Sequence, residues 1–371
     1  MSTPGNDLSQ IETPALLVDL DLMERNILRW QADFDTAGVD FRPHIKTHKS
    51  PAIAAIQIAA GAVGLAVAKV GEAEVFAAAG FRDLAVTYPV IGVSKWRRLA
   101  ELARTCTLTV NVESEPAAHG LSEAAAAAGS TIRVHLDIDL GAHRTGVRPA
   151  DAQALGELVM SLPGLHLDGI TAYRSISFPG SAGRSNEAIG REEGELLVQL
   201  AEELRAAGLP IRTVAAGSTP TSHAVATVPG ITEVRAGTYV FGDGLSTRGW
   251  GAIAEDEIAL TVLCTVVSRP IPERATIDGG SKTFSGDVAA GALPGLVGYA
   301  RALEIDAVIE AMNEEHGMLR VPAGETPRVG DRLHLVPNHV CTAVNLSDEL
   351  IGVRNGHVVT VWPIEARGKR T

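Results

Sequence analysis

Cysteine is scarce in this chain, which has 371 residues and only Cys106, Cys264 and Cys341. Three scattered thiols cannot form a disulfide framework, so we expect a reducing compartment and a cytoplasmic protein. Each cysteine is therefore to be judged as a core residue, a reactive thiol or a metal ligand.

Long apolar runs and excess positive charge are also missing. The most apolar stretch, residues 52–68, is rich in alanine and interrupted by Gln57, Gly61 and Gly64, so no membrane span is predicted. The first residues, MSTPGNDLSQIE, lack the basic and then apolar pattern of a signal peptide. The net charge of -12 argues against nucleic acid as a partner. We therefore expect neither a membrane nor a nucleic acid as partner.

The residues that are present describe a globular protein. Apolar residues make up 46% and charged residues 20%, and the length suits two domains. We expect an N-terminal strand and helix (1–25), a barrel (26–249) and a C-terminal β domain (250–371). The N-terminal strand could join either domain, with the β domain as one option.

Between residues 41 and 236 the sequence alternates short β-branched runs with longer segments of helical period. This alternation predicts a parallel sheet covered by helices. The predicted strands are residues 40–45, 63–68, 83–89, 107–112, 131–139, 167–173, 211–217 and 232–237. About eight strands are needed to close a (β/α)8 barrel, although an open doubly wound sheet would show the same alternation. After residue 250, short β-branched segments separated by turns predict the β domain.

The first candidate site is the basic segment FRPHIKTHK, residues 41–49. Lys46 follows the first predicted strand, at the end of a barrel where active sites lie. Desolvation and neighbouring positive charge free a lysine amine in such a place for Schiff-base formation. A basic run is more often a solvated loop, so this segment alone leaves both interpretations open.

Two loops rich in glycine and hydroxyl groups follow the seventh and eighth predicted strands. The candidate phosphate-binding residues are Gly217, Ser218, Thr219, Gly237, Thr238 and Tyr239. Barrels commonly bind phosphate in these two loops, and strand eight of a closed barrel pairs with strand one. The same residue types make ordinary turns. Together with Lys46, however, they suggest a phosphorylated cofactor that carries a carbonyl group.

The third candidate site is PNHVC in the β domain. His339 and Cys341 are two positions apart on a predicted strand and would therefore share a face. An imidazole and a thiolate suit zinc, and two protein ligands leave positions for substrate and water. Buried strand residues would give the same pattern. His316, in EEHG at 314–317, is a further donor or lies in an exposed turn.

These motifs resemble, in order and spacing, the D-serine dehydratase and D-threonine aldolase family, fold-type III pyridoxal 5'-phosphate enzymes related to alanine racemase. The motifs are TPALLVDLDLMERNI, RPHIKTHK, HLDIDLGAHRTGV, GSTPT, EVRAGTYVFGDG, TIDGGSKTFSGD, EEHG and PNHVCTAVN. The resemblance extends from Thr13 to the C-terminal tail. It implies a TIM-type (β/α)8 barrel, a C-terminal β domain, and a homodimer with its active site at the subunit interface.

The resemblance also implies roles for single residues. Lys46 would be the Schiff-base lysine and general base, and His339 with Cys341 would hold the metal. The implied cofactor-binding residues are His44, Arg144, Tyr173, Gly217, Ser218, Thr219, Gly237, Thr238 and Tyr239. Arg144 and Tyr173 would lie at the pyridine ring, where an arginine keeps the ring nitrogen unprotonated. Of the other basic residues, His48 would help to tune the amine, whereas Lys49 would be merely solvated.

In this family the resemblance implies that the metal pair distinguishes two reactions, His with Cys in dehydratases and His with Asp in aldolases. His339 with Cys341 therefore favours dehydration of D-serine or 3-hydroxy-D-aspartate to a 2-oxo acid and ammonia, with zinc aiding loss of the β-hydroxyl. A D-threonine or 3-hydroxy-D-amino acid aldolase, using Mn2+ or Mg2+, is the alternative. A non-catalytic pyridoxal-phosphate carrier is the alternative of another class, but carriers of that kind lack the β domain and metal pair.

One segment departs from the family pattern. Residues 171–184 read TAYRSISFPGSAGR, where an AYDGH-like sequence is expected. Arg174 could bind a second substrate carboxylate and so favour 3-hydroxy-D-aspartate over D-serine. It could equally point outward and pair with an acid. His316 is the other candidate for contact with the D-amino acid substrate.

Overall fold

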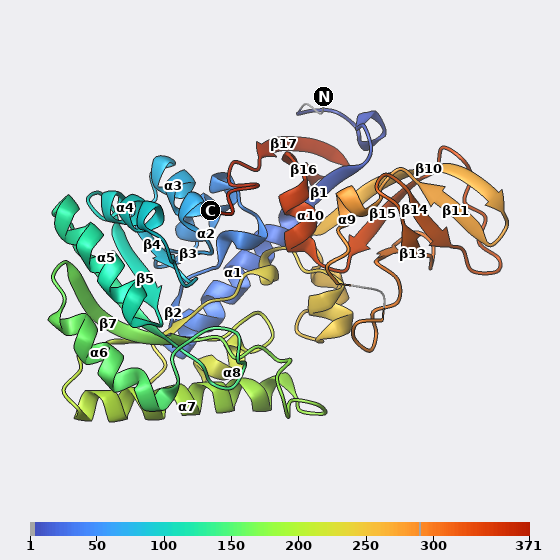
Figure 1. Cartoon of the computed structure of the whole chain (residues 1–371). Coiled ribbons are helices and arrows are strands. Elements are labelled where there is room, and N and C mark those ends of the chain that lie inside the picture. Colours follow the sequence, from blue (N-terminus) through green and yellow to red (C-terminus); the bar gives the residue numbers. More distant parts are fainter. Residues whose placement is uncertain (1–3, 289–290) are drawn as a thin grey trace. The chain divides into compact units, whose positions relative to one another are not determined.

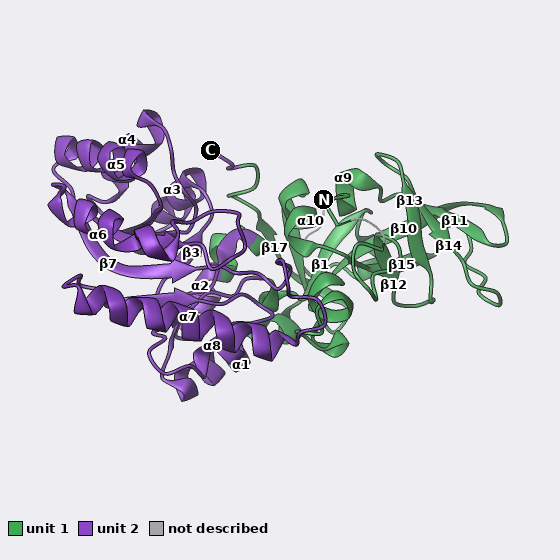
Figure 2. Ribbon diagram, turned by 60° about the horizontal axis from the view of Figure 1, so that its bottom comes forward, with its two compact units in different colours: residues 1–28, 47–53, 238–368 green, residues 29–46, 54–237, 369–371 purple. Residues whose placement is uncertain are grey.

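The computed structural model describes residues 4–288 and 291–371. It divides into two compact units (Figure 2): unit 1 comprises residues 1–28, 47–53 and 238–368, and unit 2 comprises residues 29–46, 54–237 and 369–371. In the described ranges, no helix combines the length and the apolar composition that crossing a membrane requires.

Unit 2 is built on an eight-stranded parallel sheet with the order β2-β9-β8-β7-β6-β5-β4-β3 (Figure 1). The strands are β2 (Asp40–Phe41), β3 (Leu65–Val67), β4 (Asp83–Val86), β5 (Thr107–Val112), β6 (Ile132–Ile138), β7 (Leu165–Ala172), β8 (Thr213–Ala216) and β9 (Glu233–Val234). A parallel backbone bridge between His44 and Ala66 joins the two ends of this order, so the sheet closes on itself. The predicted (β/α)8 barrel fold is confirmed.

Helices alternate with the barrel strands along the chain. They are α2 (Pro51–Ala59), α3 (Val70–Ala78), α4 (Val93–Leu102), α5 (Glu115–Ala128), α6 (Ala152–Ser161), α7 (Asn186–Ala206) and α8 (Ser222–Ala226), preceded by α1 (Leu20–Ala37). The strands are largely buried, and β3 is a continuous run of apolar residues in which Leu65, Ala66 and Val67 are fully buried. Such runs are typical of parallel strands that are covered on both faces.

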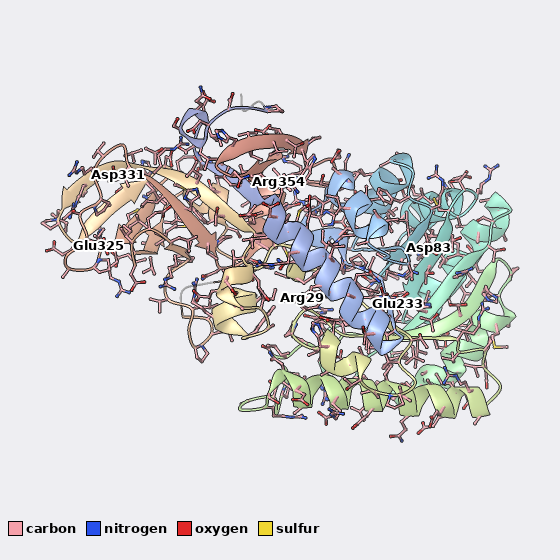
Figure 3. The ribbon with its side chains drawn as sticks, turned by 180° about the vertical axis from the view of Figure 1, so that it is seen from behind. Arg29, Asp83, Glu233, Glu325, Asp331 and Arg354 are labelled. Carbon is pink, nitrogen blue, oxygen red and sulfur yellow. The ribbon has the colours of Figure 1, made fainter. Side chains whose placement is uncertain are left out.

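A buried ion network closes the barrel where its strands begin. Arg42 donates through Nε to Glu233 at 2.8 Å and through Nη1 to Asp83 at 2.6 Å. Asp83 and Glu233 (Figure 3) are the first residues of β4 and β9. Arg235 donates to the second oxygen of Glu233 at 2.6 Å. Because these buried charges satisfy one another, this end is a structural plug, and the opposite strand ends are left for chemistry.

Unit 1 contains a nine-stranded sheet with the order β11-β14-β13-β12-β15-β10-β1-β16-β17. Its strands are β1 (Ala15–Asp19), β10 (Leu260–Ile271), β11 (Arg274–Ile277), β12 (Ala300–Ala302), β13 (Val308–Met312), β14 (Gly317–Arg320), β15 (Arg332–Pro337), β16 (Glu349–Arg354) and β17 (His357–Pro363); its short helices are α9 (Ser281–Phe284) and α10 (Val340–Leu346). The N-terminal strand β1 pairs antiparallel with β10 and parallel with β16, so it is part of this sheet.

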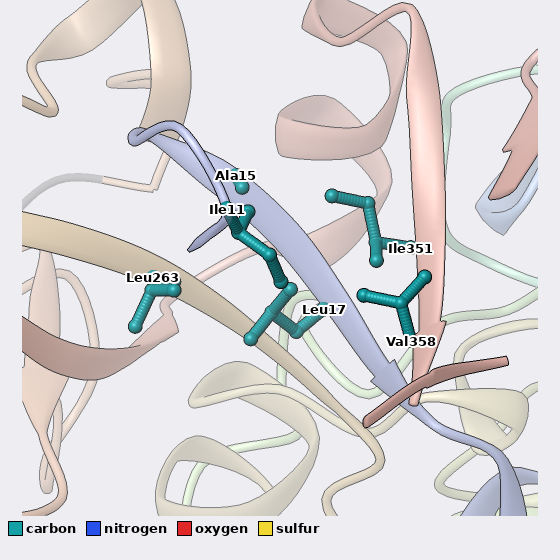
Figure 4. Close-up of a cluster of buried hydrophobic side chains, with 6 residues drawn as sticks. All are labelled: Ile11, Ala15, Leu17, Leu263, Ile351 and Val358. Atoms are coloured by element: carbon teal, nitrogen blue, oxygen red, sulfur yellow. The ribbon is translucent and has the colours of Figure 1, made fainter. Parts of the chain in front are cut away.

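A buried apolar cluster holds β1 in the sheet of unit 1 (Figure 4). Its members come from four separate stretches of the sequence: Ile11, Ala15, Leu17, Leu263, Ile351 and Val358. Because only their burial together removes this apolar surface from water, the N-terminal segment is fixed by residues more than 200 positions away, such as Leu263, the partner of Ala15.

Candidate active site

Lys46 lies where the first barrel strand ends. It occupies a single turn of 3-10 helix, Ile45–Thr47, and its side chain is exposed. Its backbone N–H donates to Nδ1 of His44 at 3.3 Å. The amine is therefore accessible, while the backbone that carries it is held in place.

His44 fixes this turn through both of its ring nitrogens. Because Nδ1 accepts the Lys46 N–H, a neutral ring carries its proton on Nε2, which lies 3.2 Å from the hydroxyl oxygen of Thr87. The Thr87 hydroxyl in turn donates to the Val67 carbonyl at 3.3 Å. The backbone N–H of His44 donates to the Ala236 carbonyl at 2.8 Å. The carboxyl ends of four barrel strands, β2, β3, β4 and β9, thus position the turn that contains Lys46.

His48 and Lys49, the last two basic residues of the segment, belong to unit 1 and are buried. The Nδ1 atom of His48 accepts the Ser50 N–H at 3.1 Å. Lys49 is only 7% exposed, so the prediction that it is merely solvated is wrong. Its backbone is left-handed (φ 52°), and its carbonyl accepts the N–H of Ala366 at 3.1 Å. The turn into α2 and the covering C-terminal segment therefore bury this lysine.

The loop after β8 forms a tight turn at residues 217–221. Gly217 has φ 94°, and a Cβ there would lie 2.9 Å from the Ser222 hydroxyl, so a side chain cannot be accommodated. The Ser218 N–H donates to the Thr221 hydroxyl at 3.0 Å, and Thr219 is buried. Among the described residues, the buried Ser222 hydroxyl has no hydrogen-bond partner. A glycine cradle beside an unsatisfied hydroxyl fits the phosphate of a cofactor.

A buried glutamate that the sequence analysis missed supports this loop. Glu193, in α7, accepts the Arg174 N–H at 2.8 Å, the Thr221 hydroxyl at 3.2 Å and the Gly217 N–H. It is 1% exposed, and burial raises its pKa to about 7. The available signal was its position between Ile189 and Leu197 in the apolar row of an amphipathic helix.

Replacing Glu193 by glutamine should stabilise the protein in a pH-dependent way. The pKa of Glu193 is about 7 in the fold against 4.5 ordinarily, so its stabilising contribution is complete below pH 4.5 and is lost as the pH rises through 7. Glutamine cannot ionise. The free energy of unfolding of E193Q, relative to that of the native protein, should therefore rise by about 3 kcal/mol from pH 4 to pH 8. Denaturant unfolding at both pH values measures this difference.

The matched control for that experiment is E195Q, which alters an exposed glutamate on the same helix. A stability difference between E193Q and the native protein that does not change with pH would rule out this role of the buried charge.

Arg144 and Tyr173 lie together on neighbouring strand ends. Arg144 follows β6 and Tyr173 follows β7, and these two strands pair in parallel. The Arg144 Cζ atom lies 4.4 Å from the centroid of the Tyr173 ring. This cation–π contact brings together the two residues that the resemblance assigned to the pyridine ring.

Arg174, directly after Tyr173, contacts α7. Its Nη1 atom donates to Glu192 at 2.6 Å, its Cζ lies 4.1 Å from the ring centroid of Phe178, and Arg184 pairs with the same glutamate oxygen. The sequence left two roles open for Arg174, binding of a substrate carboxylate or pairing with an acidic side chain. In this structure it pairs with an acidic side chain, that of Glu192. Arg174 is nevertheless buried rather than exposed, and it ties the loop after β7 to the helix that carries Glu193.

The segment after β9 crosses from unit 2 to unit 1 between Gly237 and Thr238. Thr238 and Tyr239 lie in a 3-10 turn, Thr238–Val240, whose Thr238 carbonyl accepts the N–H of Gly242 at 2.8 Å. Tyr239 is almost completely buried. This turn is therefore rigidly packed within unit 1.

His339 and Cys341 are not on a strand, so that part of the prediction is wrong. Strand β15 ends at Pro337, His339 is the N-cap of α10, and Cys341 lies in the first turn of this helix. The buried carboxylate of Asp243 accepts the Val340 N–H at 3.0 Å and so caps the helix. Because that cap comes from 97 residues away, the local β-branched pattern could not reveal the helix.

The side chains of His339 and Cys341 nevertheless lie close together. Burial disfavours the charged imidazole, but the charge of Cys341 and the hydrogen bond with Asp287 outweigh it and raise the pKa of His339 well above its usual range. The Cys341 sulfur also lies 3.3 Å from the hydroxyl oxygen of Thr47, and Thr47 follows Lys46 in the chain. An adjacent imidazole and thiol form a donor set that fits a zinc-like ion.

No group of three or more His, Cys, Asp and Glu residues able to hold a metal exists in residues 4–288 and 291–371. The candidate ligands are His339 and Cys341, and a site with two protein ligands would leave positions for substrate and water.

His316 lies on an exposed turn, as one of the two alternatives held. Its carbonyl accepts the Asn313 N–H at 2.9 Å, and the Asn313 carbonyl accepts the Ser281 N–H of α9, also at 2.9 Å. This turn is thereby fixed to α9, which packs against α10.

Comparison with known families identifies the chain. Residues 18–244 match the model of the alanine racemase N-terminal domain, and residues 259–353 match that of a putative serine dehydratase domain. The chain belongs to the alanine racemase N-terminal domain family. The resemblance read from the motifs is confirmed by these matches.

Two curated relatives of this family member cover almost its whole length. A D-threonine aldolase of Arthrobacter sp. is 35% identical over 98% of this chain and 95% of its own. A D-threo-3-hydroxyaspartate dehydratase of Delftia sp. is 36% identical over 90% of this chain and 92% of its own.

Solved structures agree with the fold. The D-threonine aldolase of Filomicrobium marinum has a TM-score of 0.91 and 33% identity, and each chain is fully covered. Two variants of a D-threo-3-hydroxyaspartate dehydratase are 34% identical, with TM-scores of 0.88 (97% and 96% covered) and 0.86 (96% and 98%). They replace a histidine and a cysteine that are two positions apart, and the cysteine variant is in a metal-free form.

Proposed function

We propose that this protein is a pyridoxal 5'-phosphate and metal-dependent lyase that dehydrates 3-hydroxy-D-amino acids to a 2-oxo acid and ammonia. The observation that carries the proposal is the contact between His339 and Cys341. The solved dehydratase variants alter the same two residue types at the same spacing. Relatives named for 3-hydroxyaspartate favour 3-hydroxy-D-aspartate over D-serine as the substrate.

In this proposal Lys46 carries the cofactor and moves the proton. When bound, pyridoxal 5'-phosphate supplies the electron sink that acidifies the Cα–H bond of an amino acid. The exposed amine of Lys46 would hold the cofactor and, when substrate is bound, would take the Cα proton. His44 keeps the lysine backbone at one place through the 3.3 Å contact from the Lys46 N–H.

The remaining barrel residues hold the cofactor in the proposal. Gly217, Ser218 and Thr219 would form the phosphate loop. Glu193 stabilises this loop by accepting hydrogen bonds from the Gly217 N–H and the Thr221 hydroxyl. Arg144, held against Tyr173, would bind beside the cofactor ring and would disfavour a proton on the ring nitrogen. Gly237, Thr238 and Tyr239 are proposed as further phosphate contacts.

His339 and Cys341 hold the divalent ion in the proposal. A thiolate with an imidazole favours Zn2+ over the harder Mg2+ or Mn2+. Such an ion supplies a Lewis acid to the departing β-hydroxyl. We also propose a cytoplasmic homodimer, with the active site at the subunit interface and His316 among the residues that contact substrate.

Aldol cleavage is the second candidate function. The observation in its favour is the pair of D-threonine aldolases that match nearly the whole chain, one at 35% identity and one with a TM-score of 0.91. The cysteine of the metal pair argues for dehydration, because the solved dehydratase variants alter a histidine and a cysteine at the same spacing.

Replacing Arg174 should test whether it selects the substrate. Because Arg174 pairs with Glu192, we expect R174Q to lose about 1–2 kcal/mol of stability. The ratio of the KM values for 3-hydroxy-D-aspartate and D-serine should change by less than about twofold. The control is R184Q, which removes the other partner of Glu192. A KM that rises only for the dicarboxylate would assign Arg174 to the substrate instead.

The experiment that tests the function is a panel of substrates assayed for both sets of products. Purified protein with pyridoxal 5'-phosphate and zinc is given D-serine, D-threonine, 3-hydroxy-D-aspartate and their L-enantiomers. We expect a 2-oxo acid and ammonia from the D-forms, and no product from the L-forms. Glycine with an aldehyde as the main products would establish the aldolase, and no product from any member would overturn both candidates.

A further inference from the structure

The loop after α9 brings a carboxylate to the metal pair of unit 1. Oδ2 of Asp287 lies 2.6 Å from Nδ1 of His339. Its other oxygen, Oδ1, accepts the hydroxyl of Thr342 at 3.0 Å and that of Ser285 at 3.2 Å. Among the described residues, the contacts of this carboxylate are therefore with its own loop and with the α10 region.

The loop is built to hold this position. Ser285 has a left-handed backbone (φ 63°), and its N–H donates to the Ser281 carbonyl at 3.0 Å. The Asp287 N–H donates back to the Ser285 hydroxyl at 3.3 Å. Thr342, in the first turn of α10, links the carboxylate to the helix that also carries Cys341. Asp287 is therefore fixed from the loop and from the helix together.

The contact decides which nitrogen of His339 is left for an ion. An imidazole that binds a metal through one nitrogen keeps its proton on the other and usually donates that proton to a carboxylate or carbonyl. Nδ1 faces Asp287, so Nε2 is the nitrogen that remains for an ion. Without the carboxylate, the ring could rotate about its side-chain bonds and present either nitrogen.

We propose that Asp287 is a positioning residue of the metal centre, which orients the His339 ring and holds the proton on Nδ1 so that Nε2 and the Cys341 sulfur bind a divalent cation. The inference rests on the proposed function only in requiring that a cation binds this pair. Thr342 and Ser285 share the role by fixing the carboxylate.

The test measures zinc binding directly rather than turnover. Metal-free protein is titrated with Zn2+ in competition with a chromophoric chelator, and with Co2+ to follow the absorption of the bound ion. We expect D287A to weaken zinc binding by about 10 to 100-fold and to alter the cobalt spectrum. D287N keeps an oxygen that accepts the Nδ1 proton, so its loss should be smaller. The zinc affinity of T342V should lie between that of D287N and that of the native protein.

The matched control is D306N, which alters a carboxylate of unit 1. This side chain is 73% exposed and, among the described residues, pairs with Arg301. Circular dichroism and thermal unfolding of the metal-free proteins show whether each variant is folded. If D287A does not fold, D287N tests the same role. Zinc binding by folded D287A and D287N equal to that of the native protein would overturn the role of Asp287. A native protein that binds no zinc would instead overturn the metal in the proposed function.

Discussion

Replacing Lys46 by alanine is expected to lower kcat by at least about 10³-fold with every D-amino acid substrate, since it removes both the covalent attachment and the base. The native side chain is exposed at the end of its barrel strand, so the variant should fold normally. The measurement is steady-state kinetics with saturating cofactor, together with absorbance near the Schiff-base band.

Borohydride reduction identifies the lysine independently of turnover. Reduced and digested native protein should carry the phosphopyridoxyl group on Lys46, and K46A should carry none. K95A, on the outer helix α4, is the control and should behave as the native protein. A label on Lys49 in the native protein, or unchanged kcat in K46A, would contradict the assignment.

Replacing Cys341 by alanine is the prediction with the second largest effect. One of the two proposed metal ligands is removed, so we expect zinc to be lost and dehydration to fall by about 10² to 10³-fold. The absorbance of bound pyridoxal 5'-phosphate should persist, because Cys341 belongs to unit 1 and contacts the Thr47 hydroxyl rather than the phosphate loop.

Chelation of the native protein should reproduce the C341A result, and added zinc should restore only the native protein. C106A alters a cysteine of unit 2 and serves as the control. Dehydration that survives both chelation and C341A without change would show that the metal pair plays no part in the reaction.

The barrel could be predicted from the sequence because its strands are local features. Segments such as Leu65–Val67 and Thr107–Val112 are short, apolar and rich in β-branched residues, and helical periods separate them. Their number implied closure, and closure placed Lys46 beside the segment that ends at Ala236. Residues joined by such regular topology are accessible to sequence reasoning.

Features that depend on distant partners could not be predicted. The helix that carries Cys341 is capped by Asp243, and the local sequence PNHVC reads as a strand without that carboxylate. Lys49 is buried because a distant segment, at Ala366, covers it. Asp287 meets His339 from 52 residues away, and the motif TIDGGSKTFSGD, which ends at Asp287, gave no sign of this contact. In each case tertiary contact overrides the local signal.

Glu193 is an intermediate case. Its place in the apolar row of α7 marks it as buried, but its partners, the Arg174 and Gly217 N–H groups and the Thr221 hydroxyl, come from two different loops. A sequence can therefore reveal that a charged residue is buried without showing which groups form hydrogen bonds with it.

The fate of a single substrate tests the central claim most directly. Both candidate reactions accept 3-hydroxy-D-aspartate, but dehydration yields oxaloacetate and ammonia, whereas aldol cleavage yields glycine and glyoxylate. ¹³C NMR of the labelled substrate, incubated with the zinc-loaded protein, distinguishes the two in one tube. We expect the label in oxaloacetate, with an equal amount of ammonia released. Label in glycine and glyoxylate would contradict the proposed dehydratase.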